Sequence, residues 1–495
     1  MAEEQKSLNQ IIQHRKEKLK KLVENGVDPF PYKFEPSHKS SEIINKFNIL
    51  EGKTIKIAGR LMAIRKMGKA SFAQILDQNG KIQIFIKENS LGYNNYKNFN
   101  LLDIGDIVGV SGKVFKTKTN EISINTSELI ILAKSIRPLP IVKEKDGKIF
   151  DGYKDKEQRY RNRHLDLILN TDIRKTFISR SIIIKELRNT LDELGFLEVE
   201  TPILQPIYGG ANARPFTTYH NSLKQNLFLR IADELYLKRL IIGGFERVYE
   251  ISKDFRNEGI DRSHNPEFTM LEFYIAYCDY NDCMKIVEDL ISNTSKAIGK
   301  EKIIIGDKKI DLTKSFKKIR YFELLKKETG YHLEDSSEAE IKNVCIEKGI
   351  EPKYPLNKGQ LLDHLMSNLV EPKLIEPTFI IDYPKVISPL AKAHRENKEN
   401  LVERFELFIG GSEFANSFSE LNDPIDQRKR FEEQARFKLE GDDEAQPIDT
   451  QFIEAMECGM PPTGGVGIGI DRLTMLLTEN RWIKDVILFP ILKSE

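Results

Sequence analysis

Cations, anions and aromatic rings are crowded into one short segment of the chain, FRNEGIDRSHNPEFTMLEFY at residues 255–274. Its charged side chains are Arg256, Glu258, Asp261, Arg262, His264, Glu267 and Glu272. A planar guanidinium such as that of Arg256 can hold a carboxylate or a phosphate through two parallel hydrogen bonds. Phe268 offers a flat face for a purine, and His264 can meet a terminal phosphate. The segment is therefore a candidate site for a phosphate-bearing ligand.

A pair of acids near the C-terminus adds a second candidate group, in FELFIGGSEFANSFSEL at residues 405–421. Glu406 and Glu413 are seven positions apart, and two short strands joined at the Gly-Gly pair would bring them together. Paired carboxylates without His or Cys suit Mg²⁺, which prefers oxygen ligands and phosphate. The later segment GIGIDRL adds Arg472 after glycines that let the backbone approach a flat ligand. Each pair alone is typical of a surface salt bridge, but the combination favours a nucleotide site.

Three familiar nucleotide signatures do not fit this chain. GGVGIG at 464–469 has Ile470 where a dinucleotide fingerprint needs its third glycine, and no acid follows at a suitable distance. KMGKA at 66–70 resembles the lysine-rich loop of class I synthetases, but it has no HxGH partner and lies between predicted strands. A GxxxxGK[ST] phosphate loop is absent. Any nucleotide must be held by other groups.

The bulk composition is that of an ordinary globular protein. The 495 residues are 40% apolar and 31% charged, which predicts two or three domains with a large core. A net charge of +1 argues against a wholly basic nucleic-acid coat but permits a local basic face. The start, MAEEQKSLNQ, lacks the apolar core of a signal peptide, and no apolar run approaches the ~18 residues of a membrane span. Four cysteines without a CxxC pair fit a reducing compartment, so we expect a cytoplasmic protein with no membrane partner.

The first part of the chain predicts a small β-barrel that follows a helical extension. Residues 1–48 begin as a polar helix, which the prolines of VDPFPYKFEP interrupt. Residues 49–140 contain five short alternating runs split by turn signals such as QNGK. Five strands in a unit of this size favour an OB-fold. Residues 141–172 are expected to form a linker.

A basic stretch accompanies Phe72 and Gln83 in the predicted barrel. Residues 53–69 contain no acid, and their cations are Lys53, Lys56, Arg60, Arg65, Lys66 and Lys69. Cations beside an exposed ring suit single-stranded nucleic acid, because the cations meet phosphates and the ring stacks on a base. A solvated sheet face with Phe72 in the core explains the residues equally well. The sequence alone leaves both interpretations open.

Residues 173–495 predict an α+β domain. A helix starting at residue 173 ends at Gly195 and carries apolar side chains on one face. Strands are then predicted at FLEVETPIL, NLFLRI, RVYEISKDF, FTMLEFYIAY, RFELFIGGSEF and GGVGIGIDRL. Runs of strands with few helices between them favour an antiparallel sheet over a doubly wound parallel one. Residues near 279–380 are mostly helical and charged, and they predict an insertion.

Three ordered segments carry a resemblance to a known family. They are the helix ending at Gly195 with FLEVETPIL, then FERVYEISKDFRNEG with DRSHNPEFTMLE, and finally GIGIDRL. Together with the barrel they resemble the class II aminoacyl-tRNA synthetases, and within them the lysyl-tRNA synthetases of the bacterial type, from about residue 50 to residue 495. One small departure is Ser263 before His264. The resemblance implies an antiparallel sheet flanked by helices, an OB-fold anticodon domain and a homodimer with Pro202 at its interface.

The resemblance also implies a two-step reaction. The carboxylate of an amino acid attacks the α-phosphate of ATP, giving an aminoacyl-adenylate and pyrophosphate, and the 3′-hydroxyl of tRNA then takes the acyl group. Positioning and charge neutralisation carry the first step. Arg256 and Arg472 would be the catalytic residues, Glu406 and Glu413 would hold Mg²⁺, and the ATP site would comprise Arg256, Glu258, His264, Asn265, Phe268 and Arg472.

The substrate implied by the resemblance is L-lysine. Its contacts would be Gly210 and Glu234 at the α-ammonium, Arg256 at the carboxylate, Glu272, Glu420 and Tyr274 at the ε-ammonium, with Asn416 and Phe418 lining the pocket. An aspartate pocket needs a cation at its far end, whereas MLEFY and NSFSEL offer acids. A buried unpaired carboxylate also opposes a neutral substrate. The alternative is that Glu272 and Glu420 pair with cations of the protein itself.

The third partner implied by the resemblance is tRNA-Lys. Phe72 would stack on the central anticodon base and Gln83 would bond its edge, and Glu121 is a possible third, acidic contact. Three other identities compete with this one. An aspartyl- or asparaginyl-tRNA synthetase shares the barrel and motifs, a protein-lysylating relative lacks the barrel, and a non-catalytic nucleic-acid-binding scaffold would have lost catalytic residues that this chain retains.

Overall fold

The computed structural model divides the chain into two compact units, residues 1–154 and residues 155–495. The residues that it describes are 7–140, 143–145, 148–150, 153–350, 357–396, 400–439 and 447–494. Parts of the predicted extension, linker and insertion therefore lie outside the described residues, at 1–6, 141–142, 146–147, 151–152 and 351–356. In the described part of the chain, no helix is both long and apolar enough to cross a membrane.

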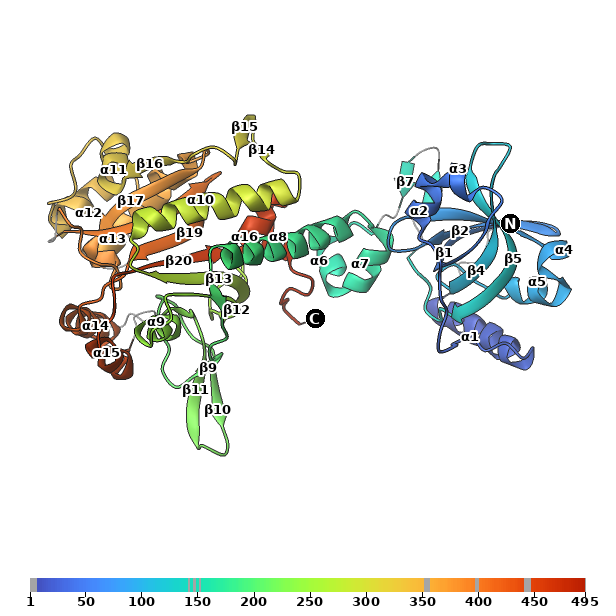
Figure 1. Cartoon of the computed structure of the whole chain (residues 1–495), viewed down its shortest axis with the longest axis horizontal. Helices are drawn as coiled ribbons and strands as arrows, with labels where there is room; N and C mark the ends of the chain where they lie inside the picture. The colour runs from blue at the N-terminus through green and yellow to red at the C-terminus, as the bar shows by residue number, and fades with distance from the viewer. Residues whose placement is uncertain are drawn as a thin grey trace. The chain divides into compact units, whose positions relative to one another are not determined.

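The first unit is a closed five-stranded barrel (Figure 1). Its strands are β1 (Thr54–Met67), β2 (Ala70–Leu76), β3 (Lys81–Lys87), β4 (Ile107–Lys116) and β5 (Ile122–Ala133), in the order β1-β2-β3-β5-β4. Alternate side chains such as Ile82, Ile84 and Ile86 point into the core, which is why a period of two in the sequence encodes the barrel. The predicted OB-fold is confirmed.

Helix α1 (Leu8–Glu24) is anchored on the barrel by polar contacts. The capping box of Ser7 and Gln10 starts it. Arg15 donates to the carbonyl oxygens of Ser135 (3.0 Å) and Ile104 (2.9 Å), and Lys18 pairs with Asp103 at 2.6 Å. The short helices α2 (Ser40–Asn45), α3 (Phe47–Leu50), α4 (Glu88–Leu91) and α5 (Tyr93–Phe99) also belong to this unit, as does the antiparallel pair of strands β6 (Lys143–Lys145) and β7 (Lys148–Phe150).

The second unit is built on an eight-stranded sheet in the order β16-β17-β18-β19-β20-β13-β12-β8. Its central strands β12 (Arg247–Phe255), β13 (Glu267–Ala276), β18 (Leu401–Ile409), β19 (Ser412–Ser419) and β20 (Thr463–Gly469) pair antiparallel. Only the outer pairs β8–β12 and β16–β17 are parallel among the pairings of the described residues in this sheet. The predicted α+β class with an antiparallel sheet is therefore confirmed.

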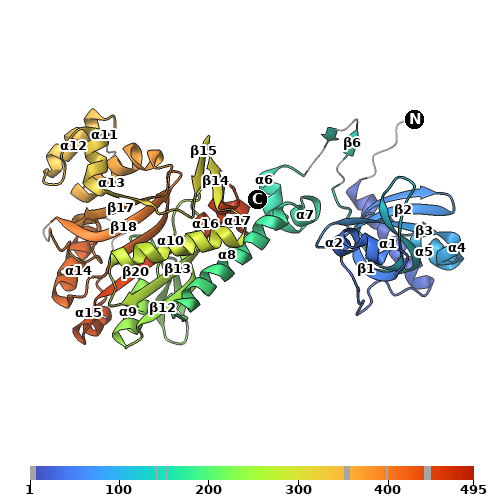
Figure 2. The same cartoon turned by 45° about the horizontal axis from the view of Figure 1, so that its top comes forward.

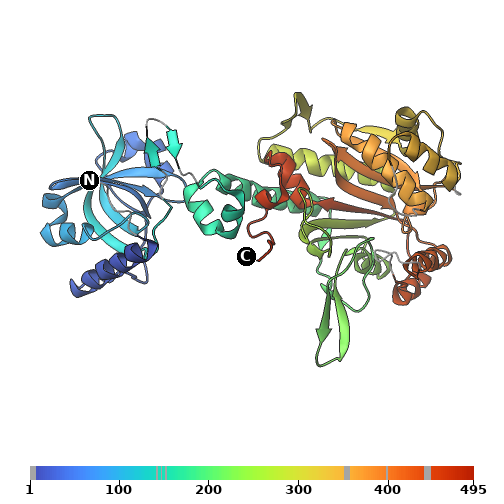
Figure 3. The same cartoon turned by 180° about the vertical axis from the view of Figure 1, so that it is seen from behind.

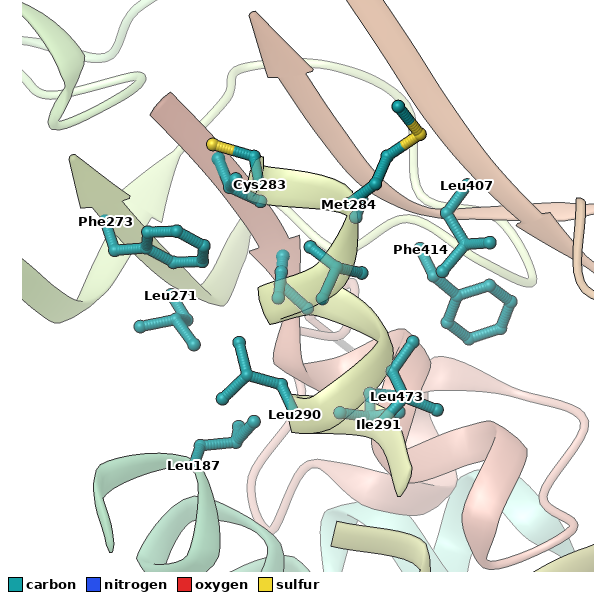
Figure 4. Packing of buried hydrophobic residues seen from close by; sticks show 14 of the residues in the cluster. Leu187, Leu271, Phe273, Cys283, Met284, Leu290, Ile291, Leu407, Phe414 and Leu473 are labelled. Carbon is teal, nitrogen blue, oxygen red and sulfur yellow. The ribbon is translucent and has the colours of Figure 1, made fainter. Parts of the chain in front are cut away.

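Helices α8 (Ile173–Glu193) and α10 (Tyr280–Ala297) cover one face of this sheet (Figure 2). Figure 4 shows Met284, Leu290 and Ile291 of α10 packed among Leu187 of α8, Leu271 of β13 and other apolar side chains. The opposite face of β12 and β13 packs against α9 (Glu234–Ile242). The two faces of β13 thus serve different purposes, since Leu271 and Phe273 enter the core while Glu272 and Tyr274 face the α9 side.

A three-stranded sheet lies beside the main one in the second unit. Its strands are β9 (Leu204–Gln205), β10 (Thr217–His220) and β11 (Gln225–Leu229), and the β10–β11 hairpin stands out from the unit in Figure 3. Helices α14 (Pro424–Leu439) and α15 (Thr450–Glu457) pack near α9, with Leu235 in one apolar cluster with Phe431 and Phe452. These elements enclose the α9 side of the sheet.

The segment FLEVETPIL is not the single strand that its pattern predicts. It forms β8 (Leu197–Glu198) in the main sheet and β9 in the smaller one. Thr201 between them donates its backbone N–H (3.1 Å) and hydroxyl (2.7 Å) to Glu250, and Pro202 has no N–H for a ladder. GGVGIGIDRL likewise changes type, because β20 ends at Gly469 and helix α16 (Ile470–Leu477) follows.

The structure draws the domain boundaries differently from the sequence. Helices α6 (Lys156–Arg161) and α7 (Arg163–Leu169), predicted as linker, belong to the second unit, where Arg163 is fully buried and donates to the Leu488 carbonyl at 2.8 Å. Within the predicted insertion, α10 is part of the main core, and β16 (Lys317–Arg320) and β17 (Thr378–Pro384) extend the main sheet. The hairpin β14 (Lys302–Ile305) and β15 (Lys308–Asp311) adds Ile303 and Ile310 to the same core. Helices α11 (Tyr321–Thr329), α12 (Glu338–Glu347) and α13 (Lys358–Leu369) instead pack into a second apolar cluster.

Candidate active site

A pocket of about 430 Å³ opens on the α9 side of the main sheet. The structure brings every residue predicted above for the catalytic unit to its wall: Gly210, Glu234, Arg256, Glu258, His264, Asn265, Phe268, Glu272, Tyr274, Glu406, Glu413, Asn416, Phe418, Glu420 and Arg472. They come from segments more than two hundred positions apart in the sequence. The roles assigned to them individually stay predictions.

Strand register explains why these residues meet. Glu272 of β13 lies opposite Gly467 of β20, which lies opposite Asn416 of β19, which in turn lies opposite Glu406 of β18. Side chains in one such row of an antiparallel sheet share a face. Two positions along, Tyr274, Gly465, Phe418 and Arg404 form a second row on the same face. The floor of the pocket is therefore laid by two adjacent rows of one sheet.

The glycines of β20 keep this floor open. A Cβ built on Gly465 would lie 2.1 Å from Oε1 of Glu420 and 2.4 Å from Cε1 of Tyr274. No side chain fits there without displacing both residues. Gly465 thus lets the carboxylate of Glu420 and the ring of Tyr274 approach the strand closely.

One end of the pocket is lined by arginines. Arg472 at the start of α16 donates to the carboxylate of Glu413 (3.1 Å) and to Nε2 of His264 (3.1 Å). Nδ1 of His264 lies 2.8 Å from a carboxylate oxygen of Asp261. Burial alone would raise the pKa of Asp261, but hydrogen bonds from the histidine and from backbone N–H groups together outweigh it and lower the pKa to about 2. Arg256 lies over the Phe268 ring, with 5.1 Å from its guanidinium carbon to the ring centroid. This end presents cations and a flat aromatic face to the cavity.

The predicted metal pair lies on the wall at this end, but not as direct cross-strand neighbours. A register shift at Leu407–Phe408 places Glu413 opposite Phe408, while Glu406 lies opposite Asn416. Glu406 accepts hydrogen bonds from Tyr383 (2.8 Å) and from Arg404. Burial raises the pKa of Glu406 to about 7, with the charge of Glu413 adding to burial and Arg404 opposing it. Both carboxylates remain at the pocket wall.

Arg404 is a pocket residue that the sequence did not reveal. Its guanidinium is stacked against the rings of Tyr383 (4.6 Å) and Phe418 (5.5 Å) and pairs with Glu406. Nothing in the segment LVERFELFI distinguishes this arginine from an ordinary strand residue. Only the row of facing positions on β18, β19 and β20 places it at the site.

The other end of the pocket is acidic. Glu234 opens α9, Glu420 follows β19, and Glu272 accepts a hydrogen bond from the hydroxyl of Tyr274 at 3.1 Å. The side chain of Lys238, one turn along α9, is 1% exposed and forms ion pairs with both Glu234 and Glu420. The protein therefore supplies a cation to two of these acids, and the expectation that the acids lack such a partner is wrong for Glu420.

A cluster of buried acids lies beneath the acidic end. Asp233, Asp254 and Glu272 each bring a carboxylate oxygen within 4.8 Å of the others. Burial and the charges of neighbouring carboxylates raise the pKa of Asp233 and Glu272. Burial, with the charge of Glu250, raises the pKa of Asp254 to about 6 against the opposing charges of Arg256 and Arg230. Arg230, itself buried, lies 3.0 Å from Asp233. Close-packed carboxylates of this kind share protons.

On the barrel, Phe72 lies outside the core and packs face to face on Phe85 of the next strand, with ring centroids 4.6 Å apart. The ring centroids of Phe115 and Phe85 are 6.1 Å apart, and Nζ of Lys87 lies 4.9 Å from the centroid of the Phe85 ring. Gln83 donates to the hydroxyl of Ser123 at 2.9 Å. The alternative that places Phe72 in the core is wrong, and Phe85 and Phe115 join it in an aromatic group that was not predicted from the sequence.

Comparison with known proteins agrees with this geometry. Residues 155–493 match the family described as tRNA synthetases class II (D, K and N), and residues 55–137 match the OB-fold nucleic acid binding domain. The chain belongs to the class II tRNA synthetases. The resemblance noted from the three sequence segments is thereby confirmed.

Two relatives of this class II tRNA synthetase align along nearly the whole chain. A protein from Carboxydothermus hydrogenoformans named lysine–tRNA ligase is 51% identical over 494 residues, covering 99% of both chains. A protein of the same name from Porphyromonas gingivalis is 47% identical over 492 residues, which are 97% of this chain and 85% of that one. The extent of both alignments includes the barrel as well as the pocket.

Proposed function

We propose that this class II tRNA synthetase is a lysine–tRNA ligase. It activates L-lysine with ATP to lysyl-adenylate, releases pyrophosphate and transfers the lysyl group to the 3′ end of tRNA-Lys. The observation that supports this most directly is the pocket, which presents carboxylates at one end and arginines at the other. Lysine carries two cations and one anion, and ATP is polyanionic, so a site that binds both needs opposite charges at its two ends.

The activation step needs no nucleophile from the protein. It requires that the carboxylate of lysine and the α-phosphate of ATP, both anionic, be held in line. The carboxylate oxygen of lysine attacks the α-phosphorus of ATP in line, and the bond from that phosphorus to the bridging oxygen of pyrophosphate breaks. Arg256 lines the pocket at the arginine end, and its planar guanidinium can bond both the carboxylate of lysine and the α-phosphate. Arg472 and His264, already hydrogen-bonded to each other, suit the terminal phosphate, and Phe268 suits the adenine.

Mg²⁺ fits the donors at the arginine end. Glu406 and Glu413 offer carboxylate oxygens beside the space for phosphates, and hard oxygen donors suit this ion. When bound, the metal neutralises charge on the phosphate oxygens. Arg404 and Arg472, each paired with one of these acids, orient the two carboxylates.

The acidic end accounts for the choice of amino acid. Gly210, with a φ of +88°, brings the backbone close to Glu234, which takes the α-ammonium. Glu420, Glu272 and the hydroxyl of Tyr274 surround the ε-ammonium, and Asn416 and Phe418 line the side-chain path. Aspartate would need a cation here, and Lys238 does not meet that need, because it lies behind the wall with its charge already paired.

The barrel would read the anticodon. Phe72 on β2 lies opposite Phe85 on β3, and Gln83 lies two positions along β3 on the same outer face, so Phe85 extends the aromatic surface. Replacement of Phe72 by Ala should raise the KM for tRNA-Lys by roughly 5- to 150-fold, since stacking contributes about 1–3 kcal/mol per base. Lysine-dependent exchange of pyrophosphate without tRNA should stay unchanged, and an equal loss in both assays would contradict an anticodon role. We further propose a cytoplasmic homodimer.

The function is tested by ATP–pyrophosphate exchange with each of the twenty amino acids, in the presence of Mg²⁺ and absence of tRNA. We expect exchange with lysine alone. Exchange with aspartate or asparagine would overturn the assignment of the acidic end while leaving the family intact. No exchange with any amino acid would contradict adenylate formation by this chain in the absence of tRNA.

A further inference from the structure

Lys238 is a buried cation that the reaction itself does not require. It lies on α9 one turn after Glu234, and its side chain is 1% exposed. Its ammonium forms ion pairs with Glu234 and Glu420, and it lies 6.0 Å from the centroid of the Tyr274 ring. Lys238 does not line the pocket, whereas all three of these neighbours do. Any effect on substrate must therefore pass through the residues that it holds.

A buried ammonium is costly unless its charge is compensated, so its presence here calls for a reason. Glu234 and Glu420 come from different elements, α9 and the end of β19, and their carboxylates would repel each other in a site of low dielectric. One ammonium between them removes that repulsion and fixes their separation. Beyond the ion pair of Oε2 with Lys238, the oxygens of Glu420 are buried and have no hydrogen-bond partner among the described residues, so Oε1 can accept a bond from a ligand.

We infer that Lys238 is a positioning residue of the amino-acid pocket, which holds Glu234 and Glu420 at the spacing and in the charge state that the two ammonium groups of the substrate require. The inference rests on the proposed function, because it takes lysine as the substrate. It adds a residue outside the pocket wall to those that determine selectivity.

The charge-state part of the inference has a definite sign. Burial and the charge of Glu234 raise the pKa of Glu420 to about 8, while Lys238 lowers it. An ammonium ligand needs the ionised carboxylate, so lysine binding strengthens as pH rises through that pKa. Removal of Lys238 raises the pKa of Glu420 further. Lysine binding is then weakened over a wider range of pH, up to that higher pKa. The other titratable groups that face these carboxylates are Glu272 and Tyr274 on β13 and Cys283 on α10.

The test compares Lys238→Met, which keeps the length of the side chain, with Lys238→Arg, which keeps the charge. In pyrophosphate exchange, Lys238→Met should raise the KM for lysine about 10- to 100-fold, the range seen when a group that orients a binding ligand is removed. The KM for ATP should change less than twofold. The pH below which the KM for lysine rises should be about one unit higher in this variant than in the unaltered protein. Lys238→Arg should recover most of the affinity.

A third variant separates positioning from support of the fold. Lys238→Ala leaves a cavity of the size of a small amine, so ethylammonium chloride should lower its KM for lysine, whereas sodium chloride at equal ionic strength should not. Lys285→Met, at an exposed position of α10, is the control for loss of a lysine. Thermal unfolding of each variant gives the fraction that is folded.

Four outcomes would overturn the inference. They are an unchanged lysine KM in Lys238→Met, an equal rise in the KM values for lysine and ATP, an unshifted pH profile, or tighter lysine binding, which would mean that Lys238 competes with the substrate for the carboxylates. Absence of lysine-dependent exchange in the unaltered protein would instead contradict the proposed function. The two failures are therefore distinguishable.

Discussion

The two ends of the pocket contain the same kinds of charge in opposite order. At the acidic end, Glu234 and Glu420 face the cavity and share Lys238, which lies behind them. At the other end the cations themselves line the cavity: Arg256, Arg404, which pairs with Glu406, and Arg472, which pairs with Glu413. Composition alone therefore does not determine which ligand each end accepts. The sign of the charged side chains that line the cavity determines which ligand each end accepts.

The largest effect on this arrangement should come from Arg256 at the arginine end. Arg256→Ala should slow lysine-dependent exchange by about 10²–10³-fold, corresponding to the ~2.7–4 kcal/mol typical of a lost donor to a developing charge. The loss should appear in kcat as well as in KM. Arg428→Ala removes a half-exposed arginine on α14 and serves as the matched control. Exchange at the unaltered rate in Arg256→Ala would refute a catalytic role for this guanidinium.

A smaller and more selective effect is expected at the acidic end. Glu420→Gln keeps the shape of the side chain but removes the charge, so the KM for lysine should rise roughly 10- to 150-fold, as for loss of a charged hydrogen bond worth about 1.5–3 kcal/mol. The KM for ATP should stay nearly constant. Glu457→Gln, at an exposed position of α15, is the control. Equal changes in both KM values would mean that the two ends do not act separately.

The smallest effect is expected from the acid pair at the arginine end. Glu413→Gln removes one negative charge beside the phosphate space, so the Mg²⁺ concentration for half-maximal exchange should rise roughly tenfold. Saturating Mg²⁺ should restore most of the rate, and the KM for lysine should not move. Glu420→Gln should change the KM for lysine and not the Mg²⁺ requirement, whereas Glu413→Gln should change the Mg²⁺ requirement and not the KM for lysine. A change in lysine KM without a change in Mg²⁺ requirement would remove Glu413 from the metal site.

Local sequence patterns predicted much of the fold because the elements involved are amphipathic in themselves. The barrel strands alternate with a period of two, and β3 places Ile82, Ile84 and Ile86 inward without reference to anything distant. The segment near 279–380 was predicted to be mostly helical, but that prediction does not say what the apolar stripe of α10 covers. That stripe packs on the main sheet, so the boundary of the insertion could not be predicted from it.

The site was predictable only where a residue type suggested its chemistry directly. Arg256 and Phe268 stood out because charge and aromatic surface rarely alternate so closely. Lys238 did not, since a lysine in ELYLKRL is typical of the exposed side of a helix. Its burial depends on Glu420, which lies 182 positions away in the sequence, and only the packing of α9 beside β13 brings the two together.

The triad of Glu234, Lys238 and Glu420 also constrains how this protein can change over evolutionary time. Loss of either glutamate leaves a buried ammonium with one partner, and loss of the lysine leaves two carboxylates facing each other. Each first step toward another amino-acid preference is therefore penalised before a second can compensate it. Because both glutamates share one lysine, a change in the amino-acid preference of this pocket is difficult to reach through single substitutions.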